Sequence, residues 1–178
     1  IGLLMSQYYN IYDCKNTQNI FTYIFNFNGY IENITHIKLL IDNNYIHACK
    51  FNKKQTKFNK MFYPPLLKKS PVKNSYNLSK DMIITGPNAS GKTTLLKSTL
   101  INLILSQQIG FGFYKSAYIN PYKYIHCYIN IPDTSGRDSL FQAEVRRCKD
   151  ILNIIDKNKK ERHFCIFDEL YSGTNPYE

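Results

Sequence analysis

The feature that most constrains the fold of this chain is an apolar run, a glycine-containing loop and a helical stripe in direct succession. Met82-Ile83-Ile84-Thr85 has the length and composition of a strand that is covered on both faces. The loop Gly86–Thr93 follows at once, and after it Leu96, Leu100 and Leu103 recur at the spacing of one helix face. We therefore predict a strand, a tight loop and a helix that packs on a sheet.

The loop reads Gly-Pro-Asn-Ala-Ser-Gly-Lys-Thr, which satisfies the phosphate-loop pattern GxxxxGK[ST] in full. Its glycines let the backbone turn successive N–H groups toward phosphate oxygens at a helix N-terminus. We expect Lys92 to contact the β- and γ-phosphates of ATP and the Thr93 hydroxyl to coordinate Mg²⁺. A tight turn of small residues is the alternative, but the flanking strand and helix favour a nucleotide site. The expected ATP-binding residues are Gly86, Pro87, Asn88, Ala89, Ser90, Gly91, Lys92, Thr93 and Thr94.

A second apolar run, Phe164–Phe167, ends in the acidic pair Asp168-Glu169. A carboxylate at the end of a neighbouring strand can hold Mg²⁺, and a second can orient or deprotonate an attacking water. We assign Asp168 to the metal and Glu169 to catalysis, together with Lys92. Alone, such a run usually marks only a strand that meets solvent. Combined with the phosphate loop, it predicts a hydrolase centre.

Two further segments complete an alternating order of strands and helices. Residues 124–131 are a strand candidate, and Ser139 begins a helical pattern in which Gln142 would complete a capping box. The resulting order of strand, helix, strand, helix, strand predicts an α/β domain with a mainly parallel sheet.

The N-terminal third of the sequence is less regular. Residues 1–30 show no clear period, whereas residues 30–45 have helical spacing and end at the turn-prone Asp42-Asn43-Asn44. Residues 45–51 then resemble a short strand, and Pro64-Pro65 is expected to stop regular structure. Because position 1 is Ile, we expect both ends to be cuts in a longer protein.

The composition excludes some classes of protein. Five cysteines are widely spaced without a CxxC pair, which favours a reducing, intracellular compartment over a disulfide framework or a zinc site. The most apolar long segment, residues 95–109, is interrupted by polar side chains, so no membrane span is predicted. The abundance of Lys, Asn, Ile and Tyr is typical of AT-rich coding, as in a large DNA virus.

The formal net charge of +10 is concentrated in one segment. From Lys50 to Lys80 there are nine lysines and no acidic residue. Such a run can neutralise the phosphates of a nucleic acid, or it can be a solvated basic face. The sequence alone slightly favours the solvated face, because AT-rich coding produces lysine regardless of function.

Several ordered motifs resemble those of the MutS family of DNA mismatch repair ATPases. Residues 84–94 are similar to its TGPNxxGKST loop, and Gln107-Gln108-Ile109-Gly110 stands where that family has AQIG. Residues 133–144 resemble its GxSTFxxE element, and residues 167–174 resemble LLDExxxGT. The resemblance extends from about Phe62 to Glu178.

This resemblance implies a P-loop NTPase of the ABC type that works as a homo- or heterodimer. It implies that residues 61–178 form an ATPase domain, incomplete at its C-terminus, and that residues 1–60 are the partly helical end of a connector. Other domains of the full-length protein would bind DNA. Ser139 would approach the γ-phosphate bound by the other subunit as a catalytic residue, while a simple helix cap is its alternative role. Asn88 would lie near the γ-phosphate.

The sequence also departs from the family pattern. Leu140 and Asn175-Pro176 replace hydroxyl-bearing residues, and Pro71 stands where an aromatic residue usually stacks on adenine. An alternative function is the ATPase subunit of an ABC-type transporter or chromosome-organising complex, but the LSGGQ-type signature of those proteins is missing. A nucleotide-sensing scaffold without activity is a third reading, which the intact Lys92 and Asp168-Glu169 disfavour.

Overall fold

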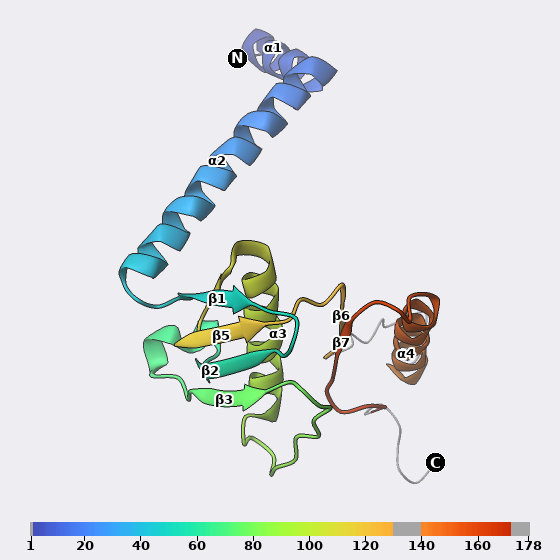
Figure 1. Cartoon of the computed structure of the whole chain (residues 1–178). Coiled ribbons are helices and arrows are strands. Elements are labelled where there is room, and N and C mark those ends of the chain that lie inside the picture. The colour runs from blue at the N-terminus through green and yellow to red at the C-terminus, as the bar shows by residue number, and fades with distance from the viewer. Residues whose placement is uncertain (1, 130–139, 172–178) are drawn as a thin grey trace. The chain divides into compact units, whose positions relative to one another are not determined.

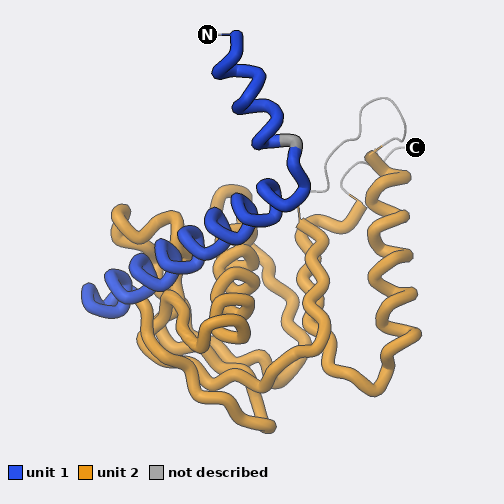
Figure 2. Tube along the Cα trace, turned by 90° about the horizontal axis from the view of Figure 1, so that it is seen from above, with its two compact units in different colours: residues 1–45 blue, residues 46–178 orange. Residues whose placement is uncertain are grey.

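The computed structural model describes residues 2–129 and 140–171. The chain divides into two compact units, residues 1–45 and residues 46–178 (Figure 2). The first unit contains two helices, α1 (Gly2–Asp13) and α2 (Lys15–Asp42). The side chain of Asn43 donates a hydrogen bond to Leu39 O at 2.7 Å, so α2 ends at the predicted turn. The helix begins about four turns earlier than the predicted residue 30. Among the described residues, no helix has the length and apolar character of a membrane span.

The second unit is built on a five-stranded sheet with the strand order β3-β2-β5-β1-β4 (Figure 1). Its strands are β1 (His47–Phe51), β2 (Lys57–Met61), β3 (Asn74–Asn77), β4 (Phe111–Gly112) and β5 (Ser116–Ile119). The predicted strand near residues 45–51 is therefore confirmed. The prolines act differently from expectation, because Pro64 begins a short 3₁₀ helix, η1 (Pro64–Lys69). The expected boundary between residues 60 and 61 falls inside β2.

The helix α3 (Lys92–Ile109) covers one face of this sheet and confirms the helix predicted after the loop. Leu103 is fully buried against Phe58 and Ile119 of the sheet. The same helix also buries polar side chains, of which Asn102 is the most constrained. Its amide donates to Phe62 O at 3.0 Å, and its carbonyl oxygen accepts from the backbone N–H of Phe113 at 2.6 Å. The helix is thus joined to the sheet by both apolar packing and buried hydrogen bonds.

A second sheet consists of the parallel strands β6 (Tyr124–Tyr128) and β7 (His163–Phe167). Both agree with the strands predicted there. Phe164 and Ile166 of β7 join the core that α3 shares with the larger sheet. The helix α4 (Leu140–Lys157) packs beside β6, and Arg147 secures it by donating to Cys127 O at 3.1 and 3.2 Å. Ser139, the predicted start of this helix, lies outside the described residues.

The α/β class is confirmed, but the prediction of a mainly parallel sheet is wrong for the described strands. Among them, β1 pairs with β5 and β6 with β7 in parallel, whereas the pairs β1–β4, β2–β3 and β2–β5 are antiparallel. The reason is that β2, β3, β4 and β5 are only two to five residues long and were not predicted as strands. They pair with β1 and β2 to make a mixed sheet.

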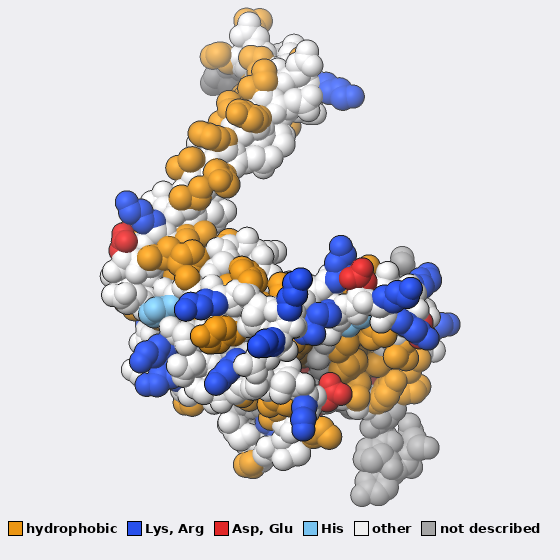
Figure 3. Space-filling model, viewed as in Figure 1, with side chains coloured by type: hydrophobic (Ala, Val, Ile, Leu, Met, Phe, Trp, Pro, Cys, Tyr) orange, Lys and Arg blue, Asp and Glu red, His pale blue; other side chains and the backbone are white. Residues whose placement is uncertain are grey.

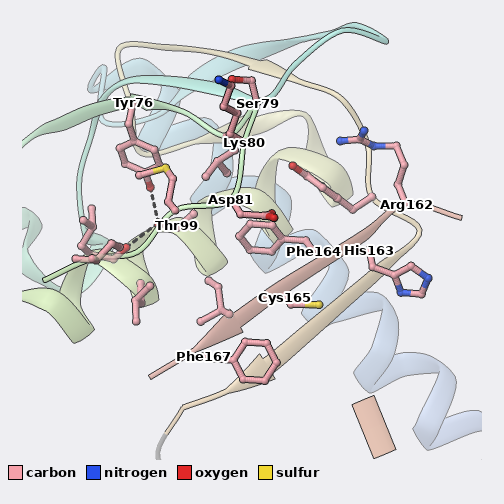
Figure 4. Close-up of a pocket in the computed structure, with 17 residues that line it drawn as sticks. Tyr76, Ser79, Lys80, Asp81, Thr99, Arg162, His163, Phe164, Cys165 and Phe167 are labelled. Carbon is pink, nitrogen blue, oxygen red and sulfur yellow. Dashed lines mark hydrogen bonds between the residues drawn. The ribbon is translucent and has the colours of Figure 1, made fainter. Parts of the chain in front are cut away.

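The prediction of a buried strand at residues 82–85 is also wrong. These residues have no regular secondary structure, and the Ile83 side chain is 94% exposed. A cavity of about 640 Å³ separates this segment from β7 (Figure 4). Within the described part of the chain β7 pairs with β6 alone, so no neighbouring strand supplies hydrogen bonds to residues 82–85. An apolar run forms a strand only where such a partner is present.

Candidate phosphate-binding site

Two residues of the loop between residue 86 and α3 have left-handed backbone torsions. Ala89 and Gly91 adopt positive φ values of +60° and +96°, and Gly91 precedes the first residue of α3. At Gly86 an added Cβ would lie 2.9 Å from Ser90 Oγ, which is closer than side chains normally approach. Glycine is therefore favoured at residue 86, where a Cβ would force the Ser90 hydroxyl to move, and at residue 91 by its torsion. The loop leads directly into the helix N-terminus, where free N–H groups favour an anion.

The side chain of Lys92 folds back over this loop. Its ammonium group donates to Gly86 O at 2.9 Å and to Pro87 O at 3.0 Å. A neighbouring cavity of about 380 Å³ is lined by the loop and the start of α3, together with Glu169 from the segment after β7. A cation, the positive end of a helix and one carboxylate thus border the same space, which is large enough for a phosphate group.

The closest contact between the loop and the acidic pair joins Thr93 to Asp168. The Thr93 hydroxyl donates to Asp168 Oδ2 at 2.7 Å, although the residues are 75 positions apart. Asp168 is held by its backbone, since its N–H donates to Tyr128 O at 2.9 Å and continues the β6–β7 ladder. Hydroxyl and carboxylate oxygens are hard ligands of the kind that Mg²⁺ prefers. This pair of oxygens fits a magnesium site beside a phosphate.

Glu169 follows Asp168 in a left-handed conformation, with φ of +48°. This torsion is uncommon for a residue with a side chain. Glu169 borders the loop cavity, whereas Asp168 contacts Thr93. The two carboxylates of the predicted pair therefore lie at the same site but make different contacts.

Two residues behind the site were not singled out from the sequence. Tyr128 is almost fully buried, and burial raises the pKa of its hydroxyl group. Glu144 of α4 is also buried, at 2% exposure, and its charge adds to the rise in the pKa of Tyr128. The signal in the sequence was that Glu144 ends the segment that resembles GxSTFxxE and stands three residues after Phe141, beside the predicted apolar face of the helix. The Tyr128 ring lies beside that of Phe167, directly before Asp168, and Glu144 lies near Tyr128.

Gln107 and Gly110 do not border the loop cavity and instead stabilise local structure. Gln107 brackets the backbone of Tyr122, donating to its carbonyl at 3.0 Å and accepting from its N–H at 2.8 Å. Gly110 ends α3 with φ of +76°. Pro71 follows η1 and is not among the described residues that line the loop cavity. Ser139 and residues 173–176 lie outside the described residues.

The amino-acid sequence of this chain is similar to those of several known proteins. A sequence model of the family "MutS domain V" matches residues 82–178. The "DNA mismatch repair protein MutS" of Bacteroides thetaiotaomicron is 31% identical over 147 residues, which cover 77% of this chain and 17% of that protein. The "Endonuclease MutS2" of Staphylococcus saprophyticus is 30% identical over 135 residues, which cover 72% of this chain and 17% of that protein. The chain thus spans about a sixth of the length of these relatives.

Proposed function

The chain belongs to the MutS family, and from this premise we propose that it is the ATP-binding and ATP-hydrolysing domain of a DNA mismatch repair protein. The observation that carries the proposal is the hydrogen bond between Thr93 and Asp168, 2.7 Å long, at the N-terminus of the helix that follows the phosphate loop. It joins the two oxygen ligands that a magnesium nucleotide requires. In this proposal the domain is a P-loop NTPase of the ABC type.

The contacts of each site residue indicate its proposed role in ATP binding or hydrolysis. The loop N–H groups and Lys92 bind the phosphates, because the ammonium group already lies over the loop at 2.9 Å from Gly86 O. Thr93 and Asp168 hold Mg²⁺, which neutralises the charge of the β- and γ-phosphates when ATP is bound. Glu169 orients the attacking water and accepts its proton.

We assign the coupling to DNA to the full-length protein. Its other domains bind DNA, and two ATPase domains associate as a homo- or heterodimer in which Ser139 reaches the partner's nucleotide. Relatives named for DNA mismatch repair support this proposal over a transporter or a chromosome-organising complex. The endonuclease relatives match much of the same segment, so membership of the MutS family is the part that both kinds of relative support.

Substitution of Lys92 tests the proposal. Lys92→Ala removes a charge-assisted contact to phosphate, worth about 1.5–3 kcal/mol, so magnesium-ATP should bind about tenfold to a hundredfold more weakly. Lys97→Ala is the matched control, because it removes the same charge from the same helix but does not border the loop cavity. Isothermal titration calorimetry measures both. Equal affinity of the Lys92 and Lys97 variants would refute the proposed site.

A further inference from the structure

The face of the five-stranded sheet that points away from α3 carries an ordered row of side chains. Phe58, Ala117 and Ile119 point toward α3 and are buried, so the alternate residues Lys57 and Tyr118 point to the other side. Cys49 packs toward the same core, which places its neighbour Lys50 on the outer face.

The register of the strands sets these outer residues side by side. Lys50 of β1 is the direct partner of Tyr118 of β5, and Tyr118 is the direct partner of Lys57 of β2. One aromatic ring, 44% exposed, therefore lies between two ammonium-bearing side chains. The next residue in the row is the amide Asn77 of β3, so the row continues without an acidic group.

The surroundings of this row are also basic. All nine lysines between residues 50 and 80 are exposed, and Lys115 lies directly before β5. Figure 3 shows Lys and Arg side chains distributed over the strands of this face. Across residues 2–129 and 140–171 no ion pair joins any of these lysines to a carboxylate. Their charges are not neutralised by the described chain.

This combination has a physical cost that a ligand would offset. Like charges on one sheet face repel each other. An exposed tyrosine ring remains in contact with water, so it lacks the stabilisation that burial of its apolar surface would give. Phosphates would neutralise the lysines and release counterions, while a base would stack on the ring. The face of the ring can stack only on an unpaired base, so a single strand fits this surface better than a duplex does.

We propose that the outer face of the five-stranded sheet binds single-stranded nucleic acid, with Lys50 and Lys57 on backbone phosphates and Tyr118 stacked on a base. This surface is separate from the phosphate loop and goes beyond the proposed function, which assigns DNA binding to other domains. It also assigns a function to the run of nine lysines from Lys50 to Lys80, which the sequence alone slightly favoured as a solvated basic face.

Fluorescence anisotropy of the full chain with labelled dT20, measured over a range of NaCl concentrations, tests the proposal. Lys50→Gln combined with Lys57→Gln should reduce the slope of log affinity against log salt by about 1.4, because each phosphate contact on a single strand contributes about 0.7. Tyr118→Val should weaken binding about fivefold to a hundredfold with an unchanged slope, whereas Tyr118→Phe should bind like the parent. Lys149→Gln combined with Lys160→Gln removes two exposed charges elsewhere and should leave the slope unchanged.

Other results would overturn the proposal. Equal losses from both lysine pairs would mean that only net charge matters. Equal binding by Tyr118→Val and the parent would mean that no base stacks there, and tighter binding of a duplex of the same length would point to a backbone surface without unpaired bases. Absence of dT20 binding by the folded parent at low salt would also exclude it. Circular dichroism verifies that each variant is folded.

Discussion

Glu169 and Asp168 are adjacent in the sequence but make different contacts, and this difference predicts separable roles. Glu169→Gln preserves the size and polarity of the side chain but removes the base, so ATP should bind normally while hydrolysis slows about a hundredfold or more. Asp168→Asn removes the negative charge from the carboxylate that contacts Thr93, so it should raise the Mg²⁺ concentration needed for ATP binding. Calorimetry and single-turnover hydrolysis measure the two effects. Each variant is the control for the other, and wild-type turnover by both would contradict the catalytic assignment.

At the residue scale, spacing could indicate a candidate site because its residues are concentrated in two short segments. The glycine pattern anticipated the torsion of Gly91 and the close approach at Gly86. The contact between Thr93 and Asp168 could be expected once both segments were assigned to one edge of the domain. The positive φ of Glu169 could not, because it depends on how the segment after β7 packs beside the loop, and no sequence pattern reports that.

Among the elements, α3 gives the clearest stability prediction. Asn102→Leu leaves the N–H of Phe113 and the carbonyl of Phe62 without their partner, and each unsatisfied buried group costs about 1–3 kcal/mol. The free energy of unfolding in urea should therefore fall by at least about 2 kcal/mol. Asn153→Leu, at an exposed position of α4, is the matched control and should change it by less than about 0.5 kcal/mol. A loss no larger than that of the control would mean that Asn102 does not join α3 to the sheet.

The elements that sequence periodicity predicted are those whose burial follows one simple period. The apolar run of β7 belongs to this group, since Phe164 and Ile166 are buried in alternation. In α3, by contrast, Leu103 is the one member of the predicted stripe Leu96, Leu100 and Leu103 that is fully buried, and the other fully buried side chains of this helix are polar. The strand β3 reads Asn-Ser-Tyr-Asn and has no apolar alternation, so only its pairing with β2 makes it a strand. The opposite failure occurred at residues 82–85, where the strand-like pattern has no pairing partner. In α1 and α2 the large apolar residues are exposed and spread over a broad arc, which hides the helical period.

For the whole molecule, the family relationship supports the C-terminal part of the chain most strongly. The family match begins at residue 82, inside the second compact unit, and it includes the loop, α3 and the acidic pair. The helical unit of residues 1–45 lies entirely outside that match. The expected connector of residues 1–60, which includes this helical unit, therefore stays a prediction from the resemblance.

The proposed dimer predicts that the nucleotide sites are shared, and heterodimers of differently tagged full-length subunits can test this. Take Lys92→Ala in one subunit and Ser139→Ala in the other. If Ser139 acts on the partner's nucleotide, both defects fall on one site and the second site stays intact. When both changes are in one subunit beside a wild-type partner, each site carries one defect. A role across the dimer therefore predicts clearly faster ATP hydrolysis from the first arrangement. Faster hydrolysis from the second arrangement would mean that Ser139 acts within its own subunit. Equal rates would mean that Ser139 is only a helix cap, because a cap stabilises α4 without contacting the reacting phosphate.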